Sequence, residues 1–142
     1  MPVTVLATGG AGYVGSHVVV ALLAAGRRVV ILDDFSNADP EAVERIAAIG
    51  AGVPEVVRGD VRDPARLDDA FGRFPIDAVV HLAGLKAVGE SVAEPLRYYT
   101  TNVAGTASLL RAMDATDVRR LVFSSSCTVY GDPERVPATL VV

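Results

Sequence analysis

Short apolar runs alternate along the chain with longer segments in which apolar residues recur every three or four positions. The apolar runs predict five β-strands, at residues 3–7, 28–32, 55–58, 77–82 and 120–124. The segments between them predict helices over residues 13–25, from 39 onward, over 63–71 and over 91–113. The chain is therefore expected to repeat a strand-then-helix unit from end to end.

Local signals set the expected ends and buried faces of the helices. Gly26 is expected to end the first helix, and Asp39 and Asp63 are N-cap candidates that each precede a proline. Ser91 and Glu94 have the spacing of a capping box, which predicts the start of the fourth helix. The apolar stripes are expected to be Val14, Val18, Ala21, Leu22 and Ala25 on the first helix, Val43, Ile46 and Ile49 on the second, and Leu96, Tyr99, Val103, Thr106, Leu110 and Met113 on the fourth.

The strand pattern favours a parallel sheet. The second, fourth and fifth strands are continuous apolar runs, which is typical of strands buried on both faces under helices. Alternating strands and helices with right-handed crossovers predict a Rossmann-type, doubly wound α/β fold, with strand order 3-2-1-4-5 and helices on both faces. A flavodoxin-like domain would share this architecture, so the fold alone does not define the function.

Composition narrows the class of protein. The chain has 142 residues, of which 51% are hydrophobic and 21% charged, so we expect one folded domain over residues 1–142. The net charge of −4 argues against nucleic-acid binding, and no apolar stretch reaches the roughly 18 residues of a membrane span. The single cysteine, Cys127, cannot form an internal disulfide and suits the cytoplasm. His17 and His81 lack metal-ligand spacing, so no metal site is expected.

Residues 8–15 form a glycine-rich loop, Thr-Gly-Gly-Ala-Gly-Tyr-Val-Gly, between the first strand and the first helix. Glycines in such a loop permit a tight turn and a close approach of backbone to phosphate, here through Gly9 and Gly12. The last glycine, Gly15, lets the helix pack closely on the strand. The helix N-terminus adds unpaired N–H groups and a positive dipole end. The loop therefore predicts a site for the pyrophosphate of a dinucleotide, with a purely structural turn as the alternative.

An aspartate selects the type of dinucleotide. Asp33 ends the second strand roughly 20 residues beyond the loop, where a carboxylate accepts hydrogen bonds from the adenosine ribose. A 2′-phosphate there would meet the negative charges of Asp33 and Asp34, so NAD is favoured over NADP. An aspartate that only shapes the loop entry is the alternative.

Later segments place further polar groups at the same sheet edge. Asp60 is expected to accept a hydrogen bond from the adenine amino group while Val61 packs on the ring, although a turn that caps the next helix is the alternative. A half-buried Asn102 is expected to bond loop backbone near the cofactor. Three hydroxyl groups end the fifth strand, at Ser124, Ser125 and Ser126. They suit hydrogen bonding beside a nicotinamide, and hydrogen bonding to loop backbone alone is the alternative.

Four segments together resemble the extended short-chain dehydrogenase/reductase family and, within it, the UDP-glucose 4-epimerases. They are Thr-Gly-Gly-Ala-Gly-Tyr-Val-Gly-Ser-His, Val-Ile-Leu-Asp-Asp, His-Leu-Ala-Gly-Leu-Lys-Ala-Val-Gly-Glu-Ser and Phe-Ser-Ser-Ser-Cys-Thr-Val-Tyr-Gly. The glycine loop is common to the whole family, whereas the segment at residues 84–91 is much more specific to the epimerases. The resemblance covers residues 3–137.

The resemblance implies a role for each matching residue. Such epimerases retain NAD, pass the C4 hydride of a UDP-sugar to it, and take the hydride back on the other face of the rotated keto sugar. Ser126 would hydrogen-bond the sugar hydroxyl that is oxidised, and Lys86 would lie near the ribose hydroxyls. The implied cofactor-binding residues are Gly9, Gly12, Tyr13, Val14, Gly15, Asp33, Asp34, Phe35, Ser36, Asn37, Ala38, Asp60, Val61, Leu82, Ala83, Gly84, Leu85, Lys86, Thr101 and Asn102.

The chain departs from the family pattern at three places. The pair Thr101 and Asn102 stands where many epimerases have two asparagines, and Cys127 stands where a small residue is usual and is expected to be buried. The Tyr-x-x-x-Lys motif that supplies the base is absent, because the only lysine is Lys86 and Leu82 stands four residues before it.

These departures lead us to expect the N-terminal part of an epimerase, truncated or frameshifted, that lacks the substrate domain and epimerase activity. The family homodimer is expected to be compromised, and the open apolar edge of the fifth strand to promote self-association. A non-catalytic NAD-binding module, or an epimerase or dehydratase of another nucleotide sugar, are the alternatives.

Overall fold

The computed structural model describes residues 2–126, 129 and 131. Its elements are β1 (Thr4–Thr8), α1 (Tyr13–Ala24), β2 (Arg28–Asp33), α2 (Glu41–Ile49), β3 (Glu55–Arg58), α3 (Pro64–Arg73), β4 (Ala78–His81), α4 (Val88–Ala93), α5 (Pro95–Tyr98), the π-helix η1 (Tyr99–Ala104), α6 (Gly105–Ala115) and β5 (Leu121–Phe123). All five predicted strands are present, each within two residues of its expected ends.

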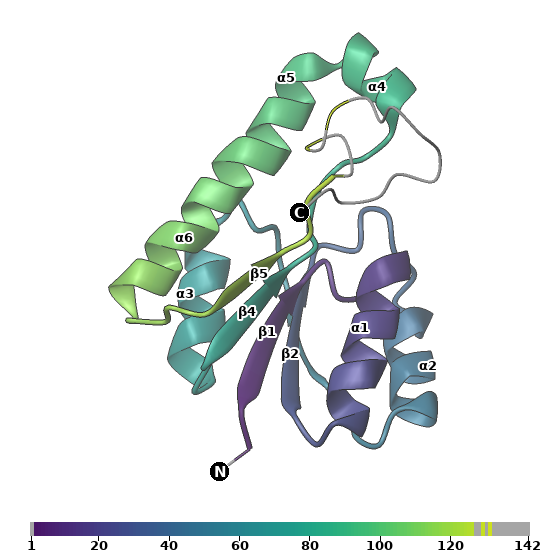
Figure 1. The fold of residues 1–142 in the computed structure, drawn as a ribbon, viewed down its shortest axis with the longest axis vertical. Coiled ribbons are helices and arrows are strands. Elements are labelled where there is room, and N and C mark those ends of the chain that lie inside the picture. Colours follow the sequence, from purple (N-terminus) through teal and green to yellow (C-terminus); the bar gives the residue numbers. More distant parts are fainter. Residues whose placement is uncertain (1, 127–128, 130, 132–142) are drawn as a thin grey trace.

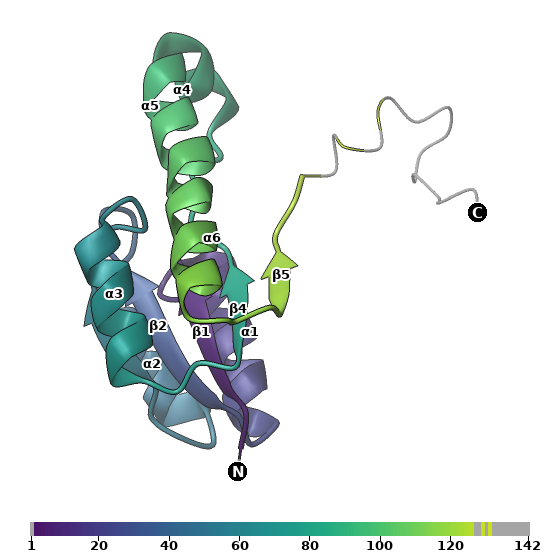
Figure 2. The same ribbon diagram turned by 90° about the vertical axis from the view of Figure 1, so that its left-hand side faces the viewer.

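The strands form one parallel sheet in the order β3-β2-β1-β4-β5, which confirms the predicted Rossmann-type topology. Helices α1 and α2 cover one face of the sheet, and α3 and α6 cover the other (Figure 1). A view rotated by 90° shows that α5, η1 and α6 form one long helical rod, residues 95–115, which extends past the end of the sheet (Figure 2). No helix in the described part of the chain is both long and apolar enough to span a membrane.

Two apolar clusters hold these layers together, one on each face of the sheet. Alternate residues of β1 and β2 point to opposite faces, so Leu6 belongs to one cluster and its neighbour Ala7 to the other. Leu67 of α3 and Leu109 of α6 are fully buried in the first cluster, and Val19 of α1 in the second. Burial of both faces explains why β2 is almost entirely apolar.

The capping signals of the first and third helices are confirmed, whereas α2 begins at Glu41 with Pro40, and not the predicted Asp39, at its N-cap position. Gly26 follows α1 with a φ of +72°, a left-handed conformation that suits glycine after a helix. Asp39 Oδ1 accepts the Glu41 N–H at 2.9 Å, and Asp63 Oδ1 accepts the Ala65 N–H at 3.0 Å with Pro64 as the first residue of α3.

The predicted buried stripe of α1 is mostly wrong. The fully buried residues are Gly15, Val19 and Leu23, whereas Val14 is exposed and Leu22 of the predicted stripe is only partly buried against the core. The helix is apolar around nearly its whole circumference, so periodicity did not define a unique face. The close packing of Gly15 against the glycine loop sets the rotation instead. On α2, only Ile46 of the predicted stripe is fully buried, and Ile49 is exposed.

The predicted long helix at 91–113 is also corrected. It begins as two short helices, α4 and α5, and continues through a π-helix into α6. Ser91 lies inside α4, where its hydroxyl donates to the Val88 carbonyl at 2.6 Å, so the predicted capping box does not form. Most of the predicted stripe, including Leu96, faces solvent, because α5 and η1 rise past the end of the sheet and bury no residue (Figure 2). The residues of α6 that reach the core are Gly105, Leu109, Ala112 and Met113.

The expectation that the fifth strand is buried on both faces is wrong as well. Leu121, Val122 and Phe123 of β5 are all exposed, because in the described part of the chain β5 pairs with β4 and no strand lies on its other side. The burial of Cys127 was also predicted, but this residue lies outside the described part.

Candidate functional site

The carboxyl ends of β1, β2 and β4 meet at one edge of the sheet, since Thr8 pairs with Leu32 on one side and with His81 on the other. A cleft of about 690 Å³ opens at this edge. It is the position where open α/β sheets bind ligands. The loops that follow β1, β2, β3 and β4 line it, together with residues of α4, α5 and η1.

The glycine loop after β1 is packed against its neighbours through backbone atoms. Gly9 has a φ of +69°, and a Cβ on it would lie 2.7 Å from the Ala83 nitrogen. A Cβ on Gly15 would lie only 2.1 Å from the Gly9 carbonyl oxygen. The loop therefore brings bare backbone to the start of α1. That helix has no acidic residue in its first turn, so its positive end is not compensated there.

Asp33, at the end of β2, ties two parts of the cleft together. Its Oδ2 accepts the N–H of Ala11 in the glycine loop, and its Oδ1 accepts the N–H of Phe35, both at 3.0 Å. The carboxylate is buried, and Phe35 adopts a positive φ of 59° directly after it. Each carboxylate oxygen has a second lone pair, so these bonds leave Asp33 able to accept hydrogen bonds from a ligand.

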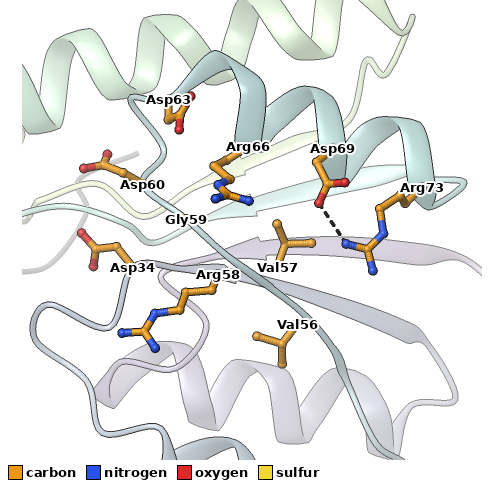
Figure 3. Close-up of a pocket in the computed structure, with 10 residues that line it drawn as sticks. All are labelled: Asp34, Val56, Val57, Arg58, Gly59, Asp60, Asp63, Arg66, Asp69 and Arg73. Atoms are coloured by element: carbon orange, nitrogen blue, oxygen red, sulfur yellow. Dashed lines mark hydrogen bonds and ion pairs between the residues drawn. The ribbon is translucent and has the colours of Figure 1, made fainter.

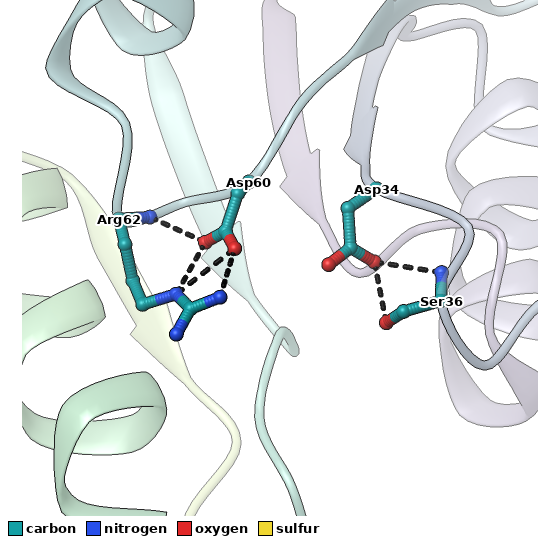
Figure 4. A network of polar contacts seen from close by, with 4 residues as sticks. All are labelled: Asp34, Ser36, Asp60 and Arg62. Carbon is teal, nitrogen blue, oxygen red and sulfur yellow. Dashed lines mark hydrogen bonds and ion pairs between the residues drawn. The ribbon is translucent and has the colours of Figure 1, made fainter. Parts of the chain in front are cut away.

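Two further carboxylates stand on neighbouring loops after β2 and β3 (Figure 4). Asp34 Oδ1 accepts hydrogen bonds from the N–H and the hydroxyl of Ser36 at 2.9 and 2.7 Å. Asp60 is held by the guanidinium and the N–H of Arg62. The hydrogen bonds from Arg62 hold the pKa of Asp60 below its usual range, although partial burial opposes this.

On the other side of the cleft, Asn102 of η1 clamps the loop that follows β4. Its side chain accepts the Leu85 N–H at 2.8 Å through Oδ1 and donates to the Leu85 carbonyl at 2.9 Å through Nδ2. The predicted contact of Asn102 with loop backbone is therefore present. Lys86, the next residue, and Thr101, the neighbour of Asn102, both line the cleft.

A cluster from α4 and α5 closes the far end of the cleft, and the sequence analysis did not predict it. The Tyr98 hydroxyl lies 2.6 Å from Glu90 Oε2 and accepts the Ala87 N–H at 3.1 Å, while Arg97 pairs with Glu90. Hydrogen bonds from Tyr98 and Arg97 hold the pKa of Glu90 below its ordinary value. All four residues line the cleft, and the cluster fixes the angle between the two short helices.

A second depression, of about 470 Å³, follows β3 and α3 (Figure 3). Arg58, Arg66 and Arg73 lie along it together with acidic residues, and Arg73 bonds Asp69 at 2.9 Å. It shares Asp34, Gly59 and Asp60 with the larger cleft, but neither the glycine loop nor the start of α1 reaches it. The larger cleft is therefore the candidate site.

The cleft and its glycine loop agree with a comparison against protein families. Residues 5–141 match the NAD dependent epimerase/dehydratase family. The chain belongs to this family.

Individual family members refine the comparison. A UDP-glucose 4-epimerase of Yersinia pestis is 53% identical over 133 residues, which are 94% of this chain and 39% of that relative. A UDP-glucose 4-epimerase of Klebsiella pneumoniae is 49% identical over 94% of this chain and 96% of its own length. The crystal structure of UDP-glucose 4-epimerase from Bifidobacterium longum in complex with NAD+ and UDP superimposes with a TM-score of 0.90 at 46% identity, over 94% of this chain and 40% of that one. The chain thus spans about two fifths of the length of the first and third of these proteins.

Most of the cofactor-binding residues predicted from the sequence line the cleft at the carboxyl ends of the strands. Of the predicted cofactor-binding residues, all but Phe35 and Asn102 line it, and those two support it through the hydrogen bonds described above. Ser126 is exposed beyond the end of β5 and does not line the cleft. The lining residues that sequence reasoning missed are Leu32, Gly59, Ala87, Glu90, Arg97 and Tyr98. Ala87 and Glu90 lie in the epimerase-like segment at 84–91, which was the available signal for them.

Proposed function

We propose that the chain binds NAD and forms the cofactor-binding part of a UDP-glucose 4-epimerase, which interconverts UDP-glucose and UDP-galactose. The observation that carries the proposal is the glycine loop. Its backbone leaves no space for a Cβ at Gly9 or Gly15, and it leads into the uncompensated N-terminus of α1 inside the cleft.

The loop fits a pyrophosphate by its chemistry. The first backbone N–H groups of a helix have no partner within the helix, and Tyr13, Val14 and Gly15 supply these groups at the cleft. The dipole of α1 adds partial positive charge at the same point. This part of the chain would hold the two phosphates by donated hydrogen bonds rather than by a cationic side chain.

The acidic end of the cleft fits an adenosine without a 2′-phosphate. Asp33 and Asp34 line it side by side, and the second lone pairs of the Asp33 oxygens suit ribose hydroxyl donors. A phosphate there would meet both negative charges. Asp60 and Val61 of the next loop would border the adenine ring.

The opposite end fits the nicotinamide half of the cofactor and the sugar. Residues 82–86 line this wall, and the Asn102 side chain holds the backbone of Leu85. Lys86 would lie near the ribose hydroxyls. Bound NAD would supply the acceptor for the hydride at C4 of the sugar. By its family resemblance, Ser126, which lies beyond β5 outside the lining of the cleft, would hydrogen-bond the hydroxyl group at that carbon where the sugar extends past the cofactor.

Calorimetric titration of the chain with NAD and with NADP tests cofactor binding. We expect saturable binding of NAD and at least tenfold weaker binding of NADP, since one closely placed pair of like charges costs on the order of 1.4 kcal/mol or more. The Asp34→Asn variant is the control for this charge effect and should narrow the difference between the two cofactors. Absence of NAD binding would contradict the proposal, and equal affinity for both cofactors would contradict the role of the carboxylates.

An assay for conversion of UDP-galactose to UDP-glucose tests the chemistry. Residues 1–142 contain no Tyr-x-x-x-Lys motif, and loss of a positioned base lowers rates by roughly 10²–10⁴-fold. We therefore expect NAD binding without measurable epimerisation by this chain alone. Turnover at an ordinary enzymatic rate would show that the base has been assigned wrongly.

A further inference from the structure

A histidine with no role in the proposed chemistry lies buried directly beneath the cleft. His81 is the last residue of β4, and only 2% of its surface is exposed. Its Nδ1 lies 2.6 Å from Thr8 Oγ1 of β1, and its Nε2 lies 2.9 Å from Thr106 Oγ1 of α6. The imidazole thus bridges the central strand of the sheet and the long helical rod.

The bonds around this ring fix the position of its proton. Thr106 Oγ1 lies 2.6 Å from the Asn102 carbonyl oxygen, which can only accept, so the single hydroxyl proton of Thr106 points there. Thr106 can therefore only accept from His81, and Nε2 must carry the ring proton. Nδ1 is then the acceptor for the Thr8 hydroxyl, whose oxygen in turn accepts the Ala83 N–H at 3.4 Å.

Both ends of this chain of hydrogen bonds reach the wall of the cleft. One end is the backbone of Ala83. The other is Asn102, whose side chain makes the two bonds to Leu85. Ala83 and Leu85 both line the cleft, and they flank Gly84 at a point where a Cβ would lie 3.1 Å from Asn102 Oδ1. A displacement of the imidazole would therefore be transmitted to the wall from two sides.

We infer that His81, as a neutral imidazole protonated at Nε2, is a positioning residue that holds residues 82–86 in register with β1 and η1 for cofactor binding. The inference rests on the proposed function in one respect, namely that this wall contacts NAD. Burial lowers the pKa of His81 to about 4, and the positive charge of Lys86 adds to this effect, which agrees with a neutral ring.

The state of the ring is tested by a long-range proton–nitrogen NMR correlation of the imidazoles at neutral pH. We expect His81 to show a protonated Nε2 and an unprotonated Nδ1, and the exposed His17 gives an internal comparison in the same spectrum. A His81 ring that is protonated at Nδ1, or at both nitrogens, would overturn the inference. This readout does not depend on whether NAD binds.

The positioning role is tested with Thr106→Val, which removes the acceptor for Nε2–H. We expect about tenfold weaker NAD binding and about tenfold faster exchange of the Leu85 amide proton, as for a lost buried hydrogen bond. Thr106→Ser, which keeps the hydroxyl group, should retain the NAD affinity and the Leu85 exchange rate of the wild type. Thr100→Val is the matched control, because Thr100 makes the same kind of bond, to the Leu96 carbonyl at 2.8 Å, away from His81.

The outcomes separate the two proposals. If Thr106→Val unfolds at lower temperature but keeps wild-type NAD affinity and Leu85 exchange, His81 is only structural and the inference fails. If the wild-type chain does not bind NAD, the proposed function fails and the cofactor role of His81 fails with it. In that case the Leu85 exchange and the NMR pattern still decide whether the imidazole positions the wall.

Discussion

Replacing Gly15 with alanine tests the close packing on which the pyrophosphate site depends. The added Cβ would lie 2.1 Å from the Gly9 carbonyl oxygen and 2.8 Å from the Gly10 Cα. Both contacts are with backbone, so no side-chain rotation can relieve them. To reach an ordinary separation of 3.4 Å, the oxygen must move by about 1.3 Å, the difference between 3.4 and 2.1 Å.

The expected cost follows from two opposing effects. Overpacking of this kind costs about 1–3 kcal/mol, whereas alanine gains about 0.5–1 kcal/mol over glycine inside a helix such as α1. We therefore expect the free energy of unfolding to fall by up to about 2.5 kcal/mol. NAD affinity should fall further, because a displacement of this size moves the backbone N–H groups away from the phosphates. Each hydrogen bond to a charged group is worth about 1.5–3 kcal/mol, which corresponds to at least about tenfold in affinity.

Denaturant unfolding and calorimetric titration with NAD measure the two effects separately. Gly72→Ala is the matched control, because Gly72 lies in α3 and no atom stands within 4 Å of the Cβ it would gain. That variant should be as stable as the wild type or up to about 1 kcal/mol more stable, with unchanged NAD affinity. If Gly15→Ala keeps both its stability and its affinity, the tight loop is not what binds the cofactor.

Three further predictions concern stability and association. Because burial lowers the pKa of His81 to about 4 from an unfolded value near 6.5, the unfolded chain binds the extra proton first, and stability should fall by about 3 kcal/mol as pH drops from about 6.5 to 4. Chemical unfolding across this pH range should show that fall in the wild type and not in His81→Gln. The same pH dependence of the free energy of unfolding in both proteins would refute this prediction. Asp33→Asn replaces one of two oxygens that accept buried N–H groups, so unfolding should become about 1–3 kcal/mol easier, whereas a change no larger than that of Asp34→Asn would show that these bonds contribute little. Val122 is 63% exposed on the unpaired edge of β5, and Val122→Lys should reduce self-association in sedimentation experiments; a wild type that stays monomeric at high concentration would rule this out.

The features predicted correctly from the sequence are those that a short stretch of residues determines by itself. A glycine loop between a strand and a helix has few other uses, and the aspartate that ends β2 is tied to the same geometry. The alternation of strands and helices likewise left few strand orders, since crossover rules exclude most arrangements for such a chain, and the observed order is one of these. Each of these predictions needed only residues close together in the sequence.

The errors arose where packing between distant residues decides the outcome. The face that α1 buries depends on the contact of Gly15 with Gly9, which no helical period encodes. The cluster of Glu90, Arg97 and Tyr98 depends on a bend between α4 and α5, and a uniform 3.6-residue period passes over such a bend. Asp33 shows an intermediate case, because its place was predicted but its hydrogen bonds to two separate loops were not.

In the π-helix η1, the number of residues determines how α5 is oriented relative to α6, in addition to the identity of those residues. In an α-helix each residue advances the chain by about 100° around the axis, and a π-helical turn accommodates one additional residue. Deletion of a single residue within Tyr99–Ala104 would close the wide turn and rotate α5, with α4 attached to it, by about that angle relative to α6. Asn102 would then no longer face Leu85. Insertions and deletions should therefore be excluded from these six residues in functional variants, even though most of their side chains face solvent.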